Sequence, residues 1–501
     1  MNMFANALNS ESNKTFTENG ATALNTTGHK LLDLFSTIGS LRERNDMEVE
    51  RLFADAYNED PLRTTKCLFY ARDIRGGLGE RKTFRTLLRY AATHHPEAVT
   101  ANLHLIGEFG RFDDLYCLMG TPLEKAMFTF VRAQLAMDER AMAAHKPCSL
   151  LAKWLKTPDA SSKETRRLGI HTATSLGMSV YVFKRKLRAL RKYIDIVERK
   201  MSLNEWDEIK YQAVPSRAMT LYRGAFGRHD EARFQAYLTA VTKGEAKINA
   251  STLYPYDLIK KYLGDGYDYL SGRGKERMKE DATVEAQWRA LPNYLSEPAN
   301  ALVIADVSGS MTSDDARPLC SSLGLAIYFA ERNTGAFHNL WMAFSRDSKV
   351  HKLRGETLAQ KLASIDTQHW AMDTNLEAAF MNILNIAREN RIPADQMVKS
   401  LIVISDMEIN SCCSSHWSFY DEMEARYRRA GYTIPNVVFW NVNSRHDVFH
   451  ADATRRGVQL CSGQSAATFK VLMASIGMTP VEMMCSVLDS ERYQRVTISE
   501  R

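Results

Sequence analysis

One short stretch limits the possible folds of this chain more than any other. The apolar run at residues 301–305 is followed at once by Asp306, and Ser308 and Ser310 come directly after it. Such a run predicts a buried strand, which ends in a loop that carries one carboxylate and two hydroxyls. In an open parallel sheet, ligands bind at this carboxyl edge of the strands. Carboxylate and hydroxyl oxygens suit a hard cation such as Mg²⁺, so the sequence predicts an α/β fold with a metal site.

From residue 299 onward, short β-rich segments alternate with longer helical ones. Strands are expected at residues 301–307, 339–344, 349–353, 400–405, 436–441 and 458–461, and helices at residues 315–332, 375–389, 420–430 and 467–475. This alternation predicts a doubly wound parallel sheet.

The preceding part of the chain has a helical pattern nearly throughout. Pro61, Pro96 and Pro122 each follow a residue that can cap a helix, so each marks an expected helix start. Antiparallel helix pairs at a spacing of roughly 35–45 residues are expected along this part of the chain, which suggests a HEAT-like stack, either open or closed into a ring. The expected divisions are an irregular arm at residues 1–28, a helical repeat domain at 29–263, a connecting segment at 264–298 and the α/β domain at 299–501.

Composition restricts the class of protein. The chain has 501 residues, of which 45% are hydrophobic and 25% charged, as in soluble proteins with more than one domain. No apolar run of about eighteen residues and no secretory signal is present, so a cytoplasmic location is expected.

The eight cysteines are scattered and are expected to be reduced thiols. Cys412, Cys413 and His416 resemble part of a soft-metal site, but no second cluster completes four ligands.

Partners for the first metal loop follow later in the chain. Asp406 comes directly after the expected strand at residues 400–405, and Thr374 precedes a helix. The predicted metal ligands are Asp306, Ser308, Ser310, Thr374 and Asp406. Five oxygens leave one position of an octahedral ion open, and because only two of them are charged the cation is under-neutralised. An octahedral Mg²⁺ that keeps one or two waters is expected. Water, Glu408 or another chain can fill that position. The competing interpretation is a cluster of helix-capping residues.

These residues resemble the metal-ion-dependent adhesion site of von Willebrand factor A domains, whose pattern Asp-x-Ser-x-Ser, Thr, Asp matches at all five positions. Helical stacks joined to such a domain also occur in the Ro autoantigen family, whose helical ring is called the TROVE module. The whole chain is similar to an uncharacterised family that pairs a Ro-like helical half with an A-type domain. The motifs that carry this similarity are Thr26-Thr27-Gly28-His29, Arg72-Asp73-Ile74-Arg75-Gly76-Gly77, Asp306–Met311, Asp373-Thr374-Asn375, Ser405-Asp406-Met407-Glu408 and Phe439-Trp440-Asn441. The resemblance implies RNA binding by the helical half.

Basic residues offer candidate contacts for RNA. Residues 1–298 hold 45 Lys and Arg against 37 Asp and Glu, whereas the remainder holds 20 against 22. The candidate RNA-binding residues are Arg72, Arg75, Lys184, Arg185, Arg188, Arg191 and Lys192. The competing interpretations are a solvated helix face for residues 184–192, and a helix-to-helix turn held by internal Arg–Asp pairs for residues 72–81.

Three functions remain open at this point. The leading hypothesis is a non-enzymatic RNA-binding scaffold, whose A-type domain docks an acidic ligand or partner through a divalent cation. The first alternative is a protein-interaction module that binds no nucleic acid. The weaker alternative is a metal-dependent phosphodiester hydrolase. The sequence singles out no catalytic residue, because no Gly-x-Ser-x-Gly and no His or Cys nucleophile arrangement is found.

Overall fold

The computed structural model describes residues 8, 11–272, 274–275, 278–295, 297–344, 348–367, 370, 375–410 and 419–498. The chain forms two compact units. One, the sheet unit, comprises Met1–Asp60, Gly76–Leu78 and Ile248–Ser490, and the other, the helical unit, comprises Pro61–Arg75, Gly79–Lys247 and Glu491–Arg501. Both units are therefore assembled from segments that lie far apart in the sequence.

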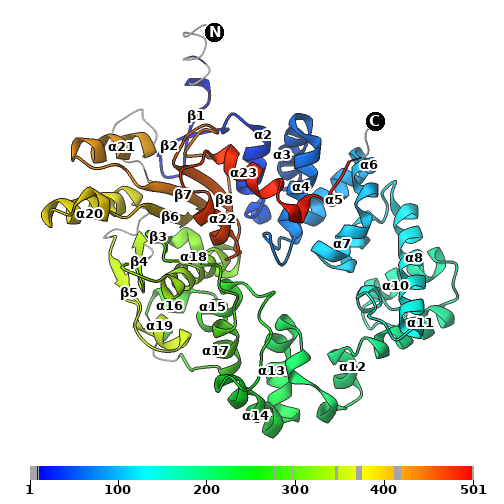
Figure 1. Ribbon diagram of the computed structural model, residues 1–501. Helices are drawn as coiled ribbons and strands as arrows, with labels where there is room; N and C mark the ends of the chain where they lie inside the picture. The colour runs from blue at the N-terminus through cyan, green and yellow to red at the C-terminus, as the bar shows by residue number, and fades with distance from the viewer. Residues whose placement is uncertain are drawn as a thin grey trace. The chain divides into compact units, whose positions relative to one another are not determined.

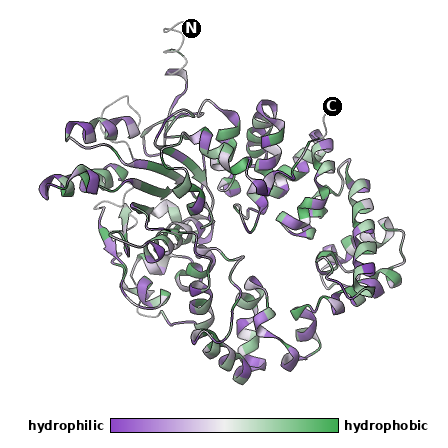
Figure 2. Cartoon of the chain, viewed as in Figure 1, coloured by the Kyte–Doolittle hydropathy of each residue, from purple (hydrophilic) through white to green (hydrophobic). Residues whose placement is uncertain are grey.

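A six-stranded sheet forms the centre of the sheet unit (Figure 1). Its strands are β3 (Ala301–Asp306), β4 (Leu340–Phe344), β5 (Val350–Lys352), β6 (Ser400–Ser405), β7 (Asn436–Asn441) and β8 (Val458–Ser462), in the order β5-β4-β3-β6-β7-β8. All neighbours are parallel except β5, which pairs antiparallel with β4 at the edge. Every residue of β3 and β6 is buried, so helices cover both faces, as in other parallel sheets. Figure 2 shows the central strands as largely hydrophobic. The predicted α/β fold class is confirmed.

The helices that follow the strands are held by aromatic side chains. Their bounds are α18 (Ser313–Arg332), α19 (Leu358–Ser364), α20 (Leu376–Glu389), α21 (Phe419–Arg429), α22 (Thr468–Ala474) and α23 (Pro480–Leu488). Phe469 of α22 stacks against Tyr328 of α18, with ring centroids 6.0 Å apart. Phe380 of α20 meets Tyr427 of α21 edge-on. Sequence patterns indicated four of these helices but neither α19 nor α23.

The first 60 residues belong to the sheet unit, which corrects the predicted division. Residues 1–28 were expected to be irregular, yet β1 (Lys14–Phe16) and β2 (Thr22–Leu24) form an antiparallel pair. Backbone bridges join Gly20 to Asn410 and Leu24 to Phe449. The helices α2 (Lys30–Thr37) and α3 (Asp46–Glu59) follow, and α2 packs against β8. The hairpin and α2 thus depend on partners some 400 residues further along the chain.

Residues 264–298 are also part of the sheet unit, although they were predicted to be a connecting segment. The segment contains α16 (Tyr267–Leu270) and α17 (Ala282–Arg289), and it directly follows α15 (Pro255–Leu263). Trp288 is buried, and its Nε1 donates to Glu331 Oε2 at 2.8 Å. The buried Glu285 carboxylate accepts from the backbone nitrogens of Leu358 and Ala359, which caps α19. These contacts make the segment a structural component of the α/β fold.

The helical unit is built from helices and short 3-10 turns, as predicted. Its α-helices are α4 (Pro61–Arg72), α5 (Lys82–His94), α6 (Pro96–Ala101), α7 (Leu103–Phe109), α8 (Glu124–Ala143), α9 (Leu151–Trp154), α10 (Lys163–Ser175), α11 (Val180–Tyr193), α12 (Val197–Ser202), α13 (Ser216–His229) and α14 (Glu231–Thr242). Two helices begin at Pro61 and Pro96, whereas α8 begins at Glu124, after Pro122. Phe69 packs against Phe84 and Phe109 in the core.

The end of the chain returns to the helical unit, although it was assigned to the α/β domain. The buried Asp73 carboxylate accepts hydrogen bonds from Arg492 Nη2 at 2.6 Å and from Tyr493 Oη at 3.0 Å. Asn102 is hydrogen-bonded through its side chain to the backbone of Thr497. Paired polar groups of this kind attach the last residues to α4 and α7.

Within the described part of the chain, no helix is both long enough and apolar enough to cross a bilayer. The described cysteines are free thiols: Cys67, Cys117, Cys148, Cys320, Cys461 and Cys485. Cys412, Cys413 and His416 lie outside the described residues.

Candidate metal and nucleic-acid sites

Strand register places the two predicted carboxylates side by side. Asp306 is the last residue of β3, and Asp406 follows the last residue of β6. The two strands are parallel neighbours, with Ala305 opposite Ile404. Their carboxyl ends therefore lie at the same edge of the sheet, as the sequence predicted.

Backbone and hydroxyl groups orient Asp306, which is fully buried. Its Oδ1 accepts from the backbone nitrogen of Ser308 at 2.9 Å, and its Oδ2 accepts from Ser405 Oγ at 2.6 Å. Ser308 Oγ lies 3.1 Å from Ser310 Oγ. Ser405 Oγ also accepts a hydrogen bond from the backbone nitrogen of Met407. Sequence analysis named Ser405 as part of a family motif but not as a site residue. Its place could have been predicted, because Ser405 is the last residue of a buried strand and directly precedes Asp406.

The buried environment and the neighbouring Asp406 destabilise the charged form of Asp306. Burial and the negative charge of Asp406 raise the pKa of Asp306 from 3.8 to about 7. Two converging carboxylates of this kind favour a cation, and the donors at hand are oxygens. Asp306, Ser308, Ser310 and Asp406 therefore fit a hard divalent ion. Thr374, the fifth predicted ligand, lies outside the described residues.

Arg445, which forms an ion pair with Asp406, was missed by sequence analysis. Its Nη2 donates to Asp406 Oδ2 at 2.9 Å, and its Nη1 lies 2.6 Å from Glu18 Oε2. Arg445 follows β7, the parallel neighbour of β6, so its place after a strand end was a usable signal. Glu18 carried no such signal, because the pairing of the N-terminal hairpin decides its position.

Glu408 was one of the groups expected to fill the open metal position, but its carboxylate contacts Glu18 and His446 instead. The side chain is 1% exposed, with Oε2 accepting from the backbone nitrogen of Glu18 at 2.6 Å. Its Oε1 lies 3.0 Å from Nδ1 of His446. Glu408 thus joins the N-terminal hairpin to the loop after β7.

Several predicted RNA-binding residues already form hydrogen bonds or ion pairs with other residues of the helical unit. Arg72 is buried, and its Nε donates to Asp114 Oδ2 at 2.7 Å, which contradicts a role in RNA contact. Arg191 is half-buried and donates to the carbonyls of Ala152 and Leu155. Lys184 pairs with Asp159 at 2.7 Å. A buried or paired cation gains less from a phosphate than a free one, because its present partners must first be given up.

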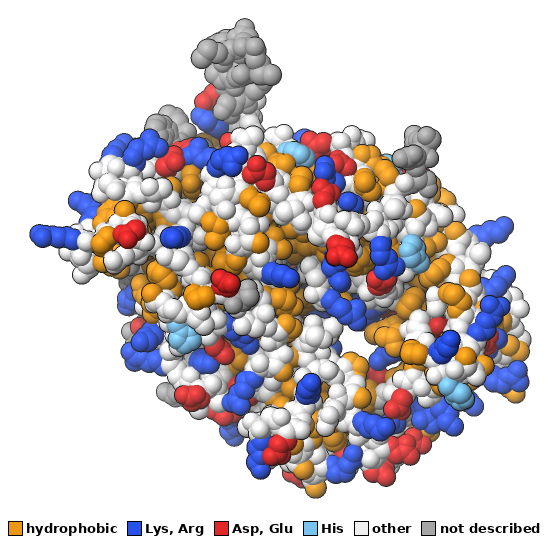
Figure 3. Space-filling model, viewed as in Figure 1, with side chains coloured by type: hydrophobic (Ala, Val, Ile, Leu, Met, Phe, Trp, Pro, Cys, Tyr) orange, Lys and Arg blue, Asp and Glu red, His pale blue; other side chains and the backbone are white. Residues whose placement is uncertain are grey.

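The remaining candidates are exposed. Arg75 lies at the surface, and its Nη1 is 3.5 Å from the carbonyl of Glu108. Arg185, Arg188 and Lys192 project from α11, and none of them has an acidic partner among the described residues. Figure 3 shows Lys and Arg side chains gathered on the face over α10, α11 and α12.

Charge is divided strongly between the two units. The helical unit holds 36 Lys and Arg against 21 Asp and Glu, a net charge of +15. The sheet unit holds 29 against 38, a net charge of −9. Residues 151–202, which form α9 to α12, contribute 13 basic against 4 acidic residues. This division is sharper than the one predicted from sequence, because residues 1–60 are acidic and belong to the sheet unit.

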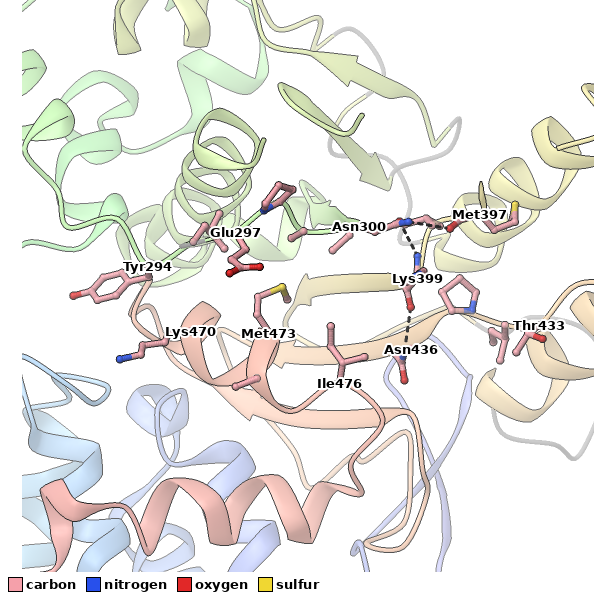
Figure 4. Close-up of a pocket in the computed structure, with 18 of the residues that line it drawn as sticks. Tyr294, Glu297, Asn300, Met397, Lys399, Thr433, Asn436, Lys470, Met473 and Ile476 are labelled. Carbon is pink, nitrogen blue, oxygen red and sulfur yellow. Dashed lines mark hydrogen bonds between the residues drawn. The ribbon is translucent and has the colours of Figure 1, made fainter. Parts of the chain in front are cut away.

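A cavity of about 790 Å³ opens at the opposite edge of the sheet, near the amino ends of β3, β6 and β7 (Figure 4). Asn300 and Asn436 hydrogen-bond to the backbone of Lys399 in its wall. Met473 and Ile476 supply apolar surface. None of the four predicted metal ligands that the structure describes lines this cavity.

The fold and the site define a two-part protein, in which a basic helical unit is inserted into an α/β unit with clustered carboxylates. The chain matches the family described as "Domain of unknown function (DUF2828)" over residues 17–146 and 147–300, and therefore belongs to it. Residues 300–497 match "Domain of unknown function (DUF7788)". The expected similarity to an uncharacterised family agrees with this result, whereas the A-domain resemblance remains a prediction.

Comparison of whole chains found similar proteins, among them a viral protein and a bacterial protein of known structure. "Uncharacterized protein L728" of Acanthamoeba polyphaga mimivirus is 26% identical over 520 residues, which cover 95% of this chain and 87% of the relative. The crystal structure of the RO (RSR) protein of Deinococcus radiodurans has a TM-score of 0.45 and 16% identity, and covers 92% of this chain and 99% of the other.

Proposed function

We propose that this protein is a non-enzymatic RNA-binding scaffold. In this proposal the helical unit binds RNA phosphates, and the sheet unit docks an acidic group through a divalent cation. The observation that carries the RNA part is the division of charge, +15 on the helical unit against −9 on the sheet unit. A surface with this excess of cations attracts polyanions, and the attraction weakens with salt as counterions are released.

Helix α11 provides the contact surface. Arg185, Arg188 and Lys192 are spaced three and four residues apart, so they project from one side of the helix. Leu187 and Leu190 are buried on the other side and hold the helix in place. A rigid row of guanidinium and ammonium groups suits successive phosphates of a nucleic-acid strand.

The test is RNA binding measured against salt with the full chain. Replacing Arg185, Arg188 and Lys192 together by Gln should lower RNA affinity and reduce the slope of log K against log salt by about 2. The matched control replaces three exposed cations of the sheet unit, Lys352, Arg388 and Arg391, by Gln. Equal losses in both triple variants would mean that net charge alone, and not α11, governs binding. If the unmodified chain shows no salt-dependent affinity for RNA, the RNA proposal is refuted and the protein-interaction alternative is favoured.

The docking part rests on Asp306 and Asp406, whose buried carboxylates lie at one edge of the sheet. Bound Mg²⁺ would supply an electrophilic centre with one position for an external carboxylate. Arg445 would compete with the ion for Asp406. Docking is favoured over hydrolysis because the predicted ligands of this ion include only two carboxylates, whereas hydrolytic sites commonly carry more charge.

Calorimetric titration with Mg²⁺ or Mn²⁺ tests this part separately. Asp306→Asn keeps an acceptor for the Ser308 nitrogen but removes a charge, and it should weaken metal binding at least about tenfold. Asp395→Asn, at an exposed carboxylate, is the control and should bind metal normally. Unchanged affinity in Asp306→Asn would refute the metal site while leaving the RNA proposal intact.

A further inference from the structure

Three ligating atoms converge beside the loop that carries Asp406. They belong to Glu18, Glu408 and His446, and one ligand atom of each residue lies within 4.8 Å of the other two. His446 Nδ1 is 3.0 Å from Glu408 Oε1 and 3.5 Å from Glu18 Oε1. The three residues come from the N-terminal hairpin, the loop after β6 and the loop after β7.

Each carboxylate is held by its other oxygen. Glu408 Oε2 accepts from the Glu18 backbone nitrogen at 2.6 Å, and Glu18 Oε2 lies 2.6 Å from Arg445 Nη1. One oxygen of each group is therefore left to face the imidazole. Outer contacts of this kind orient metal ligands and lower the cost of assembling a site.

The distances suit a tetrahedral ion. For bonds of about 2.0–2.1 Å to nitrogen and oxygen, the ligand atoms of a tetrahedral site lie about 3.3 Å apart. The two separations that involve the imidazole nitrogen, 3.0 and 3.5 Å, bracket this value. A carboxylate oxygen only accepts hydrogen bonds, so His446 Nδ1 now donates a hydrogen where the ion would sit.

Charge also favours a cation at this place. Glu18 and Glu408 lie beside Asp406 and Asp306, and among the described residues Arg445 is the permanent cation that contacts this group. Glu408 is 1% exposed, so its charge is poorly compensated by water. Glu18 is 41% and His446 57% exposed, which leaves a path for the ion and a fourth position open to solvent.

We propose that Glu18, Glu408 and His446 form a second metal site, which takes a late first-row divalent cation such as Zn²⁺ or Co²⁺. The imidazole ligand separates it from the all-oxygen site at Asp306, because Mg²⁺ prefers oxygen and Zn²⁺ accepts nitrogen readily. A bound ion fastens the N-terminal hairpin to the loops after β6 and β7. The site shares no residue with the proposed RNA-binding surface and no ligand with the Mg²⁺ site at Asp306, although Arg445 contacts both Glu18 and Asp406.

The test is titration of the full chain with Co²⁺ in excess Mg²⁺, followed by visible absorption, since tetrahedral Co²⁺ has a distinctive spectrum. One equivalent should bind and be displaced by Zn²⁺. His446→Ala and Glu18→Gln should each lower the affinity at least about tenfold, because each removes one of three ligands. His104→Ala, at an exposed histidine of α7, is the matched control and should bind normally.

Asp306→Asn separates this site from the first one and should retain the Co²⁺ spectrum. Undiminished Co²⁺ binding by both His446→Ala and Glu18→Gln would overturn the proposal, as would equal losses in the His104→Ala control. Hydrogen exchange provides a second readout. Amides of residues 17–20 should exchange more slowly with Zn²⁺ in the unmodified chain but not in His446→Ala, and no protection in the unmodified chain would refute the fastening role.

Discussion

Arg72 and Arg75 lie three residues apart and play different physical roles. The Arg72 side chain is 3% exposed and pairs with the fully buried Asp114, whereas Arg75 is at the surface. Asp114 also accepts from Arg85 Nε at 2.6 Å. Arg72→Ala should lower the free energy of unfolding of the helical unit by about 3 kcal/mol, because it leaves a buried carboxylate with one partner fewer. Denaturant titration measures this, and Arg75→Ala is the control, with an expected change within about 0.5 kcal/mol.

His351 should make the sheet unit sensitive to acid. Its ring stacks on Trp341 at 4.6 Å and lies 6.2 Å from Trp370. Burial among these groups lowers the pKa of His351 from 6.5 to about 4. The unfolded chain therefore binds a proton first, so this contribution to stability is present above pH 6.5 and is lost as the pH falls toward 4.

At pH 5 the expected loss from His351 is about 1–2 kcal/mol relative to pH 7.5. His351→Phe keeps a stacked ring without a titrating group, so the difference in unfolding free energy between these two pH values should shrink. The remaining loss belongs to residues such as His450, whose pKa burial lowers to about 4. An unchanged pH dependence in His351→Phe would contradict the assignment.

At the scale of elements, the packing of α2 on β8 depends on close backbone approach. A Cβ atom at Gly39 would lie 2.7 Å from Gly463 Cα, and the backbone nitrogen of Gly39 donates to Ser462 Oγ at 3.0 Å. Gly39→Ala should destabilise the sheet unit by about 1–3 kcal/mol, since backbone atoms cannot move aside as a side chain can. Thermal unfolding of the variant measures this effect.

Gly227 is the contrasting position for that experiment. It lies within α13, and no atom is found within 4 Å of a Cβ built there. Gly227→Ala should therefore stabilise the helical unit by up to about 1 kcal/mol through helix propensity. A similar destabilisation by both substitutions would show that close packing does not explain the effect at Gly39.

At the scale of the whole molecule, the sheet unit is interrupted by the helical unit in sequence. Residues 1–60 supply α2, whose Leu31, Leu32 and Phe35 are at most 1% exposed. A fragment of residues 299–501 should therefore fail to unfold cooperatively, because it lacks α2, α15 and α17 and exposes the surfaces they cover. Joining residues 1–60 to 248–490 by a flexible linker of about 15 residues should restore a cooperative transition in circular dichroism. Cooperative unfolding of the short fragment would contradict this division.

Local pattern was sufficient for much of the sheet unit. The bounds of β6 and β7 agree with the predicted strands, because apolar β-branched runs identify buried strands. The proximity of Asp306 and Asp406 was also predictable, since parallel strands present their carboxyl ends at one edge. The assignment of a metal to them remains a prediction. The edge strand β5 runs antiparallel, which alternation alone did not indicate.

By itself, the sequence determined the succession of elements, the order of the predicted metal ligands and the presence of a basic helical part, because these depend on periodicity and residue type. Only the tertiary structure decided that residues 1–60 complete the sheet unit, that Arg72 is buried and that Arg445 lies on Asp406. The tertiary structure alone also decided that Glu18, Glu408 and His446 converge. Each of these depends on contacts between residues far apart in the chain, and no local pattern records which distant segment will supply a partner.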